Sequence, residues 1–175
     1  MHRLSVLLFF FLFINISMAN ESIVLPEGWR FPTAEELSDE PGRNNSSTRH
    51  AKAVADFNGD GIEDEAFLLK SIRFSGEGLW VHLSDKRKGF RWLSLDSIDW
   101  GKAYPNVNLS MGIDTVKPGE YKTACGKGYF KCGKGEPEIL ILKRPAIDYF
   151  RFGSANSFFF WDDQTDNFKR IWISD

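Results

Sequence analysis

The chain has 175 residues, of which 22 are lysine or arginine and 24 are aspartate or glutamate, so its formal net charge is −2. This balance excludes the strongly basic class of general nucleic-acid binders and the class of highly charged disordered tails. Sixteen phenylalanines and six tryptophans favour strands, because aromatic side chains pack well on pleated sheets. The composition predicts a mostly β protein large enough to bury a real core.

Residues 1–19 are expected to be a cleaved secretory signal peptide. A short basic start, Met1 to Arg3, precedes an apolar run from Leu4 to Ile16, and Ser17 to Ala19 supplies small residues at a cleavage site. The apolar run is too short to span a bilayer comfortably, and this order of segments is typical of signal peptides. An uncleaved N-terminal anchor is the alternative. We expect a periplasmic or secreted protein that forms one mostly-β domain over residues 20–175 and has no membrane span after cleavage.

A short N-terminal helix is expected before the strands begin. Pro32 to Leu37 has Thr33 at the N-cap position and Glu36 three residues later, which are the two partners of a capping box. Residues 38–48 are rich in Asp, Glu, Asn, Ser, Gly and Pro, so a loop should follow this helix.

Short strands and turns should fill the rest of the chain. Gly78 to Leu83 alternates as a half-buried strand does, and Phe90 to Leu95 is its expected hairpin partner. Glu138 to Lys143 is a continuous apolar run, which predicts a central strand. The other expected strands are 50–55, 65–70, 109–113, 149–152, 157–161 and 168–173. A polar turn should join the last two. The pattern predicts an antiparallel sheet or sandwich of the mostly β (α+β) class.

An acidic loop between two of these strands carries the strongest motif. Asp56, Asn58, Asp60 and Asp64 place oxygen side chains at loop positions one, three, five and nine, with a glycine at position six. Calcium takes six to eight oxygen ligands with flexible geometry, and glycine permits the sharp turn that wraps the chain around the ion. The spacing predicts a calcium site, with the carbonyl of Ile62 as a further ligand. A plain hairpin turn without metal is the alternative, because Asn-Gly and Asp-Gly favour turns.

The stretch from Val54 to Leu69, VADFNGDGIEDEAFLL, resembles the calcium loops of FG-GAP and VCBS repeats in integrin-type propellers. The resemblance implies calcium as the cofactor. Its ligands would be Asp56, Asn58, Asp60, Ile62 and Asp64. Those families repeat the loop several times, whereas this chain has one copy, so we expect a local structural site and not a full propeller. An EF-hand is a poorer match, because Phe67 stands where its position-twelve glutamate is required.

A lysine-rich loop contains the two cysteines, Cys125 and Cys132. Export would place them in an oxidising compartment, which predicts a disulfide, whereas half of a zinc site would need a nearby histidine. Aromatic residues favour interfaces, and lysines steer acidic partners, so a rigid loop of this kind can bind a partner. The candidate partner-binding residues are Lys127, Tyr129, Phe130, Lys131 and Lys134. A solvent-exposed turn that is closed by the disulfide and binds no partner is the simpler interpretation.

No catalytic constellation can be assembled from the sequence. Only His50 and His82 follow the signal segment, and no serine lies in a G-x-S-x-G elbow. We therefore expect an exported calcium-binding protein that acts by binding, as an inhibitor or immunity-type protein for another exported protein, such as a toxin or an enzyme. A carbohydrate or cell-wall binding module is the first alternative. Its candidate sugar-stacking residues are Trp80, Trp92, Trp100, Trp161 and Trp172. A small secreted hydrolase is the second alternative, because carboxylates are plentiful.

Overall fold

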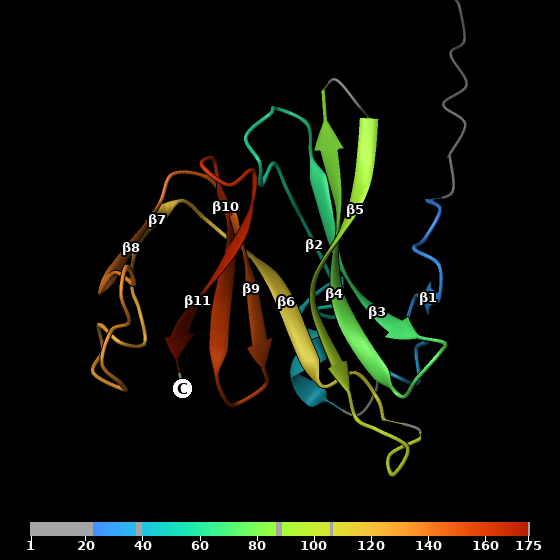
Figure 1. Cartoon of the computed structure of the whole chain (residues 1–175). Coiled ribbons are helices and arrows are strands. Elements are labelled where there is room, and N and C mark those ends of the chain that lie inside the picture. Colours follow the sequence, from blue (N-terminus) through green and yellow to red (C-terminus); the bar gives the residue numbers. More distant parts are fainter. Residues whose placement is uncertain (1–22, 38–39, 87–88, 106, 175) are drawn as a thin grey trace, which may run out of the picture.

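Figure 1 shows the computed structural model, which describes residues 23–174 except 38–39, 87–88 and 106. The expected signal peptide of residues 1–19 lies outside the described residues. In the described part of the chain, no helix is long and apolar enough to cross a membrane. The one helix in that part is a 3-10 helix, η1 (Pro41–Asn45), and the other elements there are strands.

The first sheet is antiparallel and has β3 at its centre. Its strands are β1 (Trp29–Arg30), β2 (Lys52–Ala55), β3 (Asp64–Ser71), β4 (Gly76–Asp85) and β5 (Gly89–Asp99). Strands β1 and β2 pair with opposite ends of β3, while β4 pairs with β3 and β5 pairs with β4. The β4–β5 hairpin confirms the strand pair predicted from 78–83 and 90–95, with His82 opposite Trp92.

The second sheet holds the C-terminal strands. It contains β6 (Met111–Val116), β9 (Ala146–Arg151), β10 (Asn156–Asp162) and β11 (Asn167–Ser174), in the order β11-β10-β9-β6. The polar turn predicted between the last two strands is confirmed, because Asp162 pairs with Asn167 at the end of the β10–β11 ladder. A separate pair, β7 (Gly119–Lys122) and β8 (Ile139–Leu142), forms a two-stranded sheet.

The two larger sheets pack face to face as a sandwich, and the small sheet covers part of the outer side of the second sheet (Figure 1). The main core forms between the larger sheets and includes Leu79 and Val81 from β4 and Ile147 and Phe159 from the second sheet. This follows from the strand period of two, which sends alternate side chains inward. A smaller core lies under the two-stranded sheet. It contains Val116, Leu140, Leu142, Ala146, Phe158, Ile171 and Ile173.

Two buried charged side chains form hydrogen bonds with residues 109–111, where β6 begins. Arg43 donates to the carbonyl oxygens of Leu109 at 2.9 Å and Met111 at 2.6 Å. Glu77 accepts hydrogen bonds from the main chain and hydroxyl of Ser110 and from the main chain of Met111. Burial raises the pKa of Glu77, and these hydrogen bonds oppose that rise. Because buried charged groups need such partners, Arg43 ties the start of β6 to η1, and Glu77 of β4 ties it to the first sheet.

The predicted N-terminal helix is not formed. Its capping-box hydrogen bonds are present, from the Thr33 amide to Glu36 at 2.8 Å and from the Glu36 amide to Thr33 at 3.2 Å. Residues 34–37 nevertheless form only a turn. The Glu36 carboxylate also binds Arg30 of β1, and a single turn is too short to offset the cost of helix nucleation.

The prediction that 138–143 is a central strand is wrong. This segment forms β8, which pairs with β7 in the two-stranded sheet. Leu140 and Leu142 are buried, whereas Ile139 and Ile141 are 52% and 64% exposed. An unbroken Ile-Leu-Ile-Leu run is apolar on both faces, so the sequence could not show that one face meets solvent.

Candidate functional site

The acidic loop joins β2 to β3 at one end of the sandwich, at the top of Figure 1. The Asp56 carboxylate accepts hydrogen bonds from the amides of Gly59 at 2.7 Å, Asp60 at 3.0 Å and Gly61 at 2.8 Å. Gly61 has a φ of 85°, a backbone conformation that glycine adopts without strain. The loop therefore folds around the Asp56 carboxylate, whereas the predicted wrapping around a calcium ion stays a prediction.

Asp64 anchors the base of this loop. It is fully buried, and its two carboxylate oxygens accept four hydrogen bonds. Two come from the amides of Phe57 and Asn58 in the loop, at 2.8 and 3.3 Å, and two come from the amide and hydroxyl of Ser84 in β4, at 2.7 and 2.6 Å. Burial raises the pKa of Asp64, while these hydrogen bonds oppose the rise. Asp64 thus joins the loop to the neighbouring strand.

Three of the predicted ligands lie around the Ser84 hydroxyl, which is 2.6 Å from Asp64 Oδ1, 3.2 Å from Asp60 Oδ1 and 3.4 Å from the carbonyl oxygen of Ile62. Among the described residues, no three His, Cys, Asp or Glu side chains come together in a group that could hold a metal ion. Asn58 accepts a hydrogen bond from the Asp60 amide, and Asp60 accepts one from the Ile62 amide. The second carboxylate oxygen of Asp60 is buried and has no hydrogen-bond partner in the described structure. Because an unpaired buried carboxylate oxygen is unfavourable, this atom is the one that best fits a cation.

Arg144 connects the acidic loop to the β10–β11 turn. Its guanidinium donates to the main-chain carbonyl of Asn58 and, at 2.8 Å, to the carboxylate of Asp163. A pocket of about 430 Å³ at this end of the sandwich is lined by Asp60, Asp163 and Asp166, among others. With Asp85 at the end of β4, four aspartates therefore line one pocket beside the acidic loop, together with Lys86 and Arg91. No sequence pattern indicated the contact between Arg144 and Asn58, because these residues are 86 positions apart.

The predicted disulfide between Cys125 and Cys132 is formed. The base of its loop is buried at Thr123, Ala124 and Cys125. The Thr123 amide donates to the carbonyl of Glu138 at 2.9 Å, and the Ala124 amide donates to the carbonyl of Trp172 in β11 at 2.8 Å. Covalent closure and these hydrogen bonds hold the loop in one position against the second sheet.

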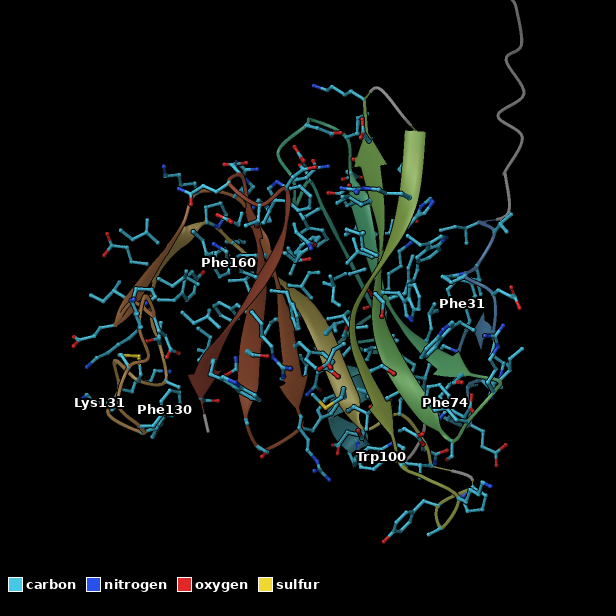
Figure 2. The ribbon with its side chains drawn as sticks, in the orientation of Figure 1. Phe31, Phe74, Trp100, Phe130, Lys131 and Phe160 are labelled. Carbon is cyan, nitrogen blue, oxygen red and sulfur yellow. A yellow bond between two sulfur atoms is a disulfide. The ribbon has the colours of Figure 1, made fainter. Side chains whose placement is uncertain are left out.

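The tip of the disulfide loop is exposed. Tyr129 and Phe130 are 55% and 43% exposed, and Lys131 and Lys134 are also exposed. Figure 2 shows Phe130 and Lys131 at the left edge of the molecule, below the two-stranded sheet. Lys127 has a different position, because its ammonium donates to the carbonyl of Ile173 at 2.8 Å. Lys127 therefore helps to hold the loop on β11, and the other four candidates form its accessible tip.

The candidate tryptophans do not form one platform. Trp80 and Trp92 contact each other on the outer face of the first sheet, with ring centroids 6.5 Å apart. Trp161 packs toward the main core, whereas Trp172 is exposed and lies 4.4 Å from the Arg170 guanidinium. Trp100 follows the end of β5 and is half-buried.

The two histidines lie in separate aromatic surroundings. His50 packs edge-on against Phe150 and Phe152, whereas His82 stacks on Phe90 with ring centroids 4.6 Å apart. Burial lowers the pKa of His82, so its neutral form is favoured. The ring contacts place His82 among aromatic side chains on the outer face of the first sheet.

No family model, no curated protein and no solved structure matches this chain. The resemblance of Val54 to Leu69 to FG-GAP and VCBS loops therefore stays a prediction that rests on the loop residues themselves.

Proposed function

We propose that this chain is an exported binding protein of the inhibitor or immunity type, which docks on another exported protein through its disulfide loop. The supporting observation is the contrast between the buried base of the loop at Thr123 to Cys125 and the exposed aromatic tip at Tyr129 and Phe130. A loop fixed in this way loses little conformational entropy on binding. Exposed tyrosine and phenylalanine supply the apolar contact area that interfaces favour.

The charge of the tip indicates the kind of partner. Lys131 and Lys134 flank the second cysteine and are exposed, and Lys122 is exposed on β7. Lysines at the rim of an interface accelerate the encounter with an acidic partner. The proposed partner therefore presents an apolar pocket bordered by carboxylates, as an acidic enzyme cleft does.

The outer side of β8 enlarges the proposed docking surface. Ile139 and Ile141 are exposed on the strand that directly follows the disulfide loop. Figure 1 shows β8 and the loop at the same outer edge of the molecule. Exposed isoleucines beside exposed aromatic residues form an apolar patch, and a partner that buries such a patch removes apolar surface from water.

Calcium is the proposed cofactor of the acidic loop, with Asp56, Asn58, Asp60, Ile62 and Asp64 as its holding residues. The unpaired buried oxygen of Asp60 supports this assignment. A bound calcium ion would supply the positive charge that this oxygen lacks, and its role would be structural. Millimolar calcium is expected to raise the melting temperature of the wild type, and Asp60→Ala should abolish the rise. An unchanged melt with calcium or chelator would contradict the assignment.

Affinity capture from a cell-envelope extract tests the binding function. The mature chain of residues 20–175 is immobilised beside a Tyr129→Ser/Phe130→Ser double variant and a Tyr104→Ser control, whose tyrosine is exposed on a different loop. We expect one protein to be retained in stoichiometric amount by the wild type and the control, and lost from the loop variant. Equal retention by all three, or retention of no protein, would refute the proposal.

A further inference from the structure

The outer face of the first sheet carries a second surface, which is independent of the disulfide loop. His82 stacks on Phe90 at 4.6 Å with an interplanar angle of 12° and lies 4.8 Å from Trp92. Trp92 continues the row toward Trp80 at 6.5 Å and Phe67 at 5.9 Å. Cross-strand register produces this row, because these side chains project from the same face of β3, β4 and β5.

A groove of about 780 Å³ runs over part of this aromatic row. Residues 23–25 line it, and the Trp92 indole donates to the carbonyl of Val24 at 2.8 Å, which holds that segment beside the sheet. The remaining lining extends from Val54 on β2 to Phe90 on β5. This volume lies within the range of sites that enclose a ligand, and Phe90 is 54% exposed.

The charged residues that line this groove are Glu63 and Glu65, and its lining includes no lysine or arginine. Glu63 directly precedes β3 and Glu65 is its second residue, and both side chains line the groove. Glu63 makes no ion pair with any residue that the structure describes. His82 adds no positive charge near neutral pH, because burial lowers its pKa. The groove therefore combines aromatic rings with the unpaired carboxylate of Glu63, while Glu65 is paired with Lys52.

The same face already binds a cation of the protein itself. The Lys52 ammonium pairs with Glu65 Oε1 and lies 5.1 Å from the centre of the Phe67 ring. An ammonium held between a carboxylate and an aromatic ring is stabilised by both, since the ring face attracts cations. The side chains of Glu63, Phe90 and Trp92 offer the same combination without an internal cation.

We propose that this groove binds an extended peptide segment of a partner protein through a lysine or arginine side chain. The cation is received by Glu63 beside the rings of Phe90 and Trp92, while Glu65 keeps its pair with Lys52. Apolar side chains on either side of the cation pack on Val54 and on residues 23–25. A peptide satisfies both features, because it carries a charged side chain and apolar neighbours on one chain.

Fluorescence anisotropy with two labelled peptides tests this proposal. One peptide has the sequence Leu-Lys-Leu-Lys-Leu, and the matched peptide has glutamate in place of both lysines. We expect the lysine peptide alone to bind, and Glu63→Gln or Phe90→Ala to weaken it about tenfold, as the loss of one cation contact implies. Phe130→Ala on the disulfide loop and Tyr104→Ala should leave the affinity unchanged, which separates this groove from the proposed inhibitor function.

Four outcomes would overturn the proposal. The first is that neither peptide binds at millimolar concentration, and the second is that both bind equally. The third is unchanged affinity in Glu63→Gln and Phe90→Ala proteins whose circular dichroism matches the wild type. The fourth is competition by spermidine or by soluble cell-wall saccharides at lower concentration than the peptide, which would assign the groove to a free cation or to a sugar.

Discussion

Replacing Asp64 with asparagine tests whether this carboxylate holds the acidic loop to the first sheet. The wild-type carboxylate accepts from the amides of Phe57 and Asn58 and from the amide and hydroxyl of Ser84. In Asp64→Asn, one oxygen becomes an amino group, which can no longer accept from a pair of these donors. Each buried donor left without an acceptor costs about 1–3 kcal/mol, so we expect a loss of about 3 kcal/mol in the free energy of unfolding.

The assay is thermal unfolding in chelator, followed by circular dichroism. For a domain of about 150 residues, 1 kcal/mol corresponds to about 2–4 °C, so the melting temperature should fall by about 6–12 °C. Asp60→Asn is the matched control, because Asp60 is only half-buried and one of its oxygens has no partner to lose. It should change the melting temperature by less than about 3 °C. An Asp64→Asn protein that melts like the wild type, or a control that is equally destabilised, would refute the role assigned to Asp64.

Two further predictions concern other parts of the fold. Gly126→Ala is expected to destabilise the disulfide loop by about 1–3 kcal/mol, because its new Cβ would lie 2.1 Å from the carbonyl oxygen of Glu138. Gly133→Ala is the control, and it should be nearly neutral in thermal unfolding because its new Cβ has a closest contact of 3.4 Å. The hydrogen bond and charge of Arg30 lower the pKa of Glu36 from 4.5 to about 2, so this pair stabilises the fold above pH 4.5 and loses its effect as the pH falls through 2. Glu36→Gln should therefore cost about 1 kcal/mol at pH 7, after solvent screening of the half-exposed pair, and the difference from wild type in urea unfolding should shrink toward pH 2; an equal difference at both pH values would contradict it.

Local alternation was enough to predict most of the strands. The β4–β5 hairpin was readable because inward Leu79, Val81 and Leu83 alternate with Trp80 and His82. Alternation could not place the 138–143 segment, where both faces are apolar. The capping box of residues 33–36 forms its hydrogen bonds, yet the local motif does not decide whether enough further turns follow to make a helix.

The candidate sites were less accessible to sequence reasoning, because distant segments complete them. The spacing of the acidic residues predicted a sharp loop around a calcium ion, and the structure has a sharp loop whose amides donate to Asp56. The spacing could not show that Ser84 of β4 donates to one oxygen of Asp64, or that Arg144 donates to the carbonyl of Asn58. The groove on the outer face was invisible for the same reason, since its aromatic row depends on the register of three strands, and Glu63 gave no signal beyond its place in an acidic run.

Strand β11 is a common support for the two sites of the proposed function. The turn between β10 and β11 contains Asp163, whose carboxylate accepts a hydrogen bond from Arg144 on the side of the acidic loop. The end of the same strand offers its carbonyl oxygens at Trp172 and Ile173 to the disulfide loop, through the Ala124 amide and Lys127. The groove on the first sheet rests instead on β2 to β5. A perturbation that loosens β11 therefore acts on the acidic loop and the disulfide loop together, while the groove keeps its own support.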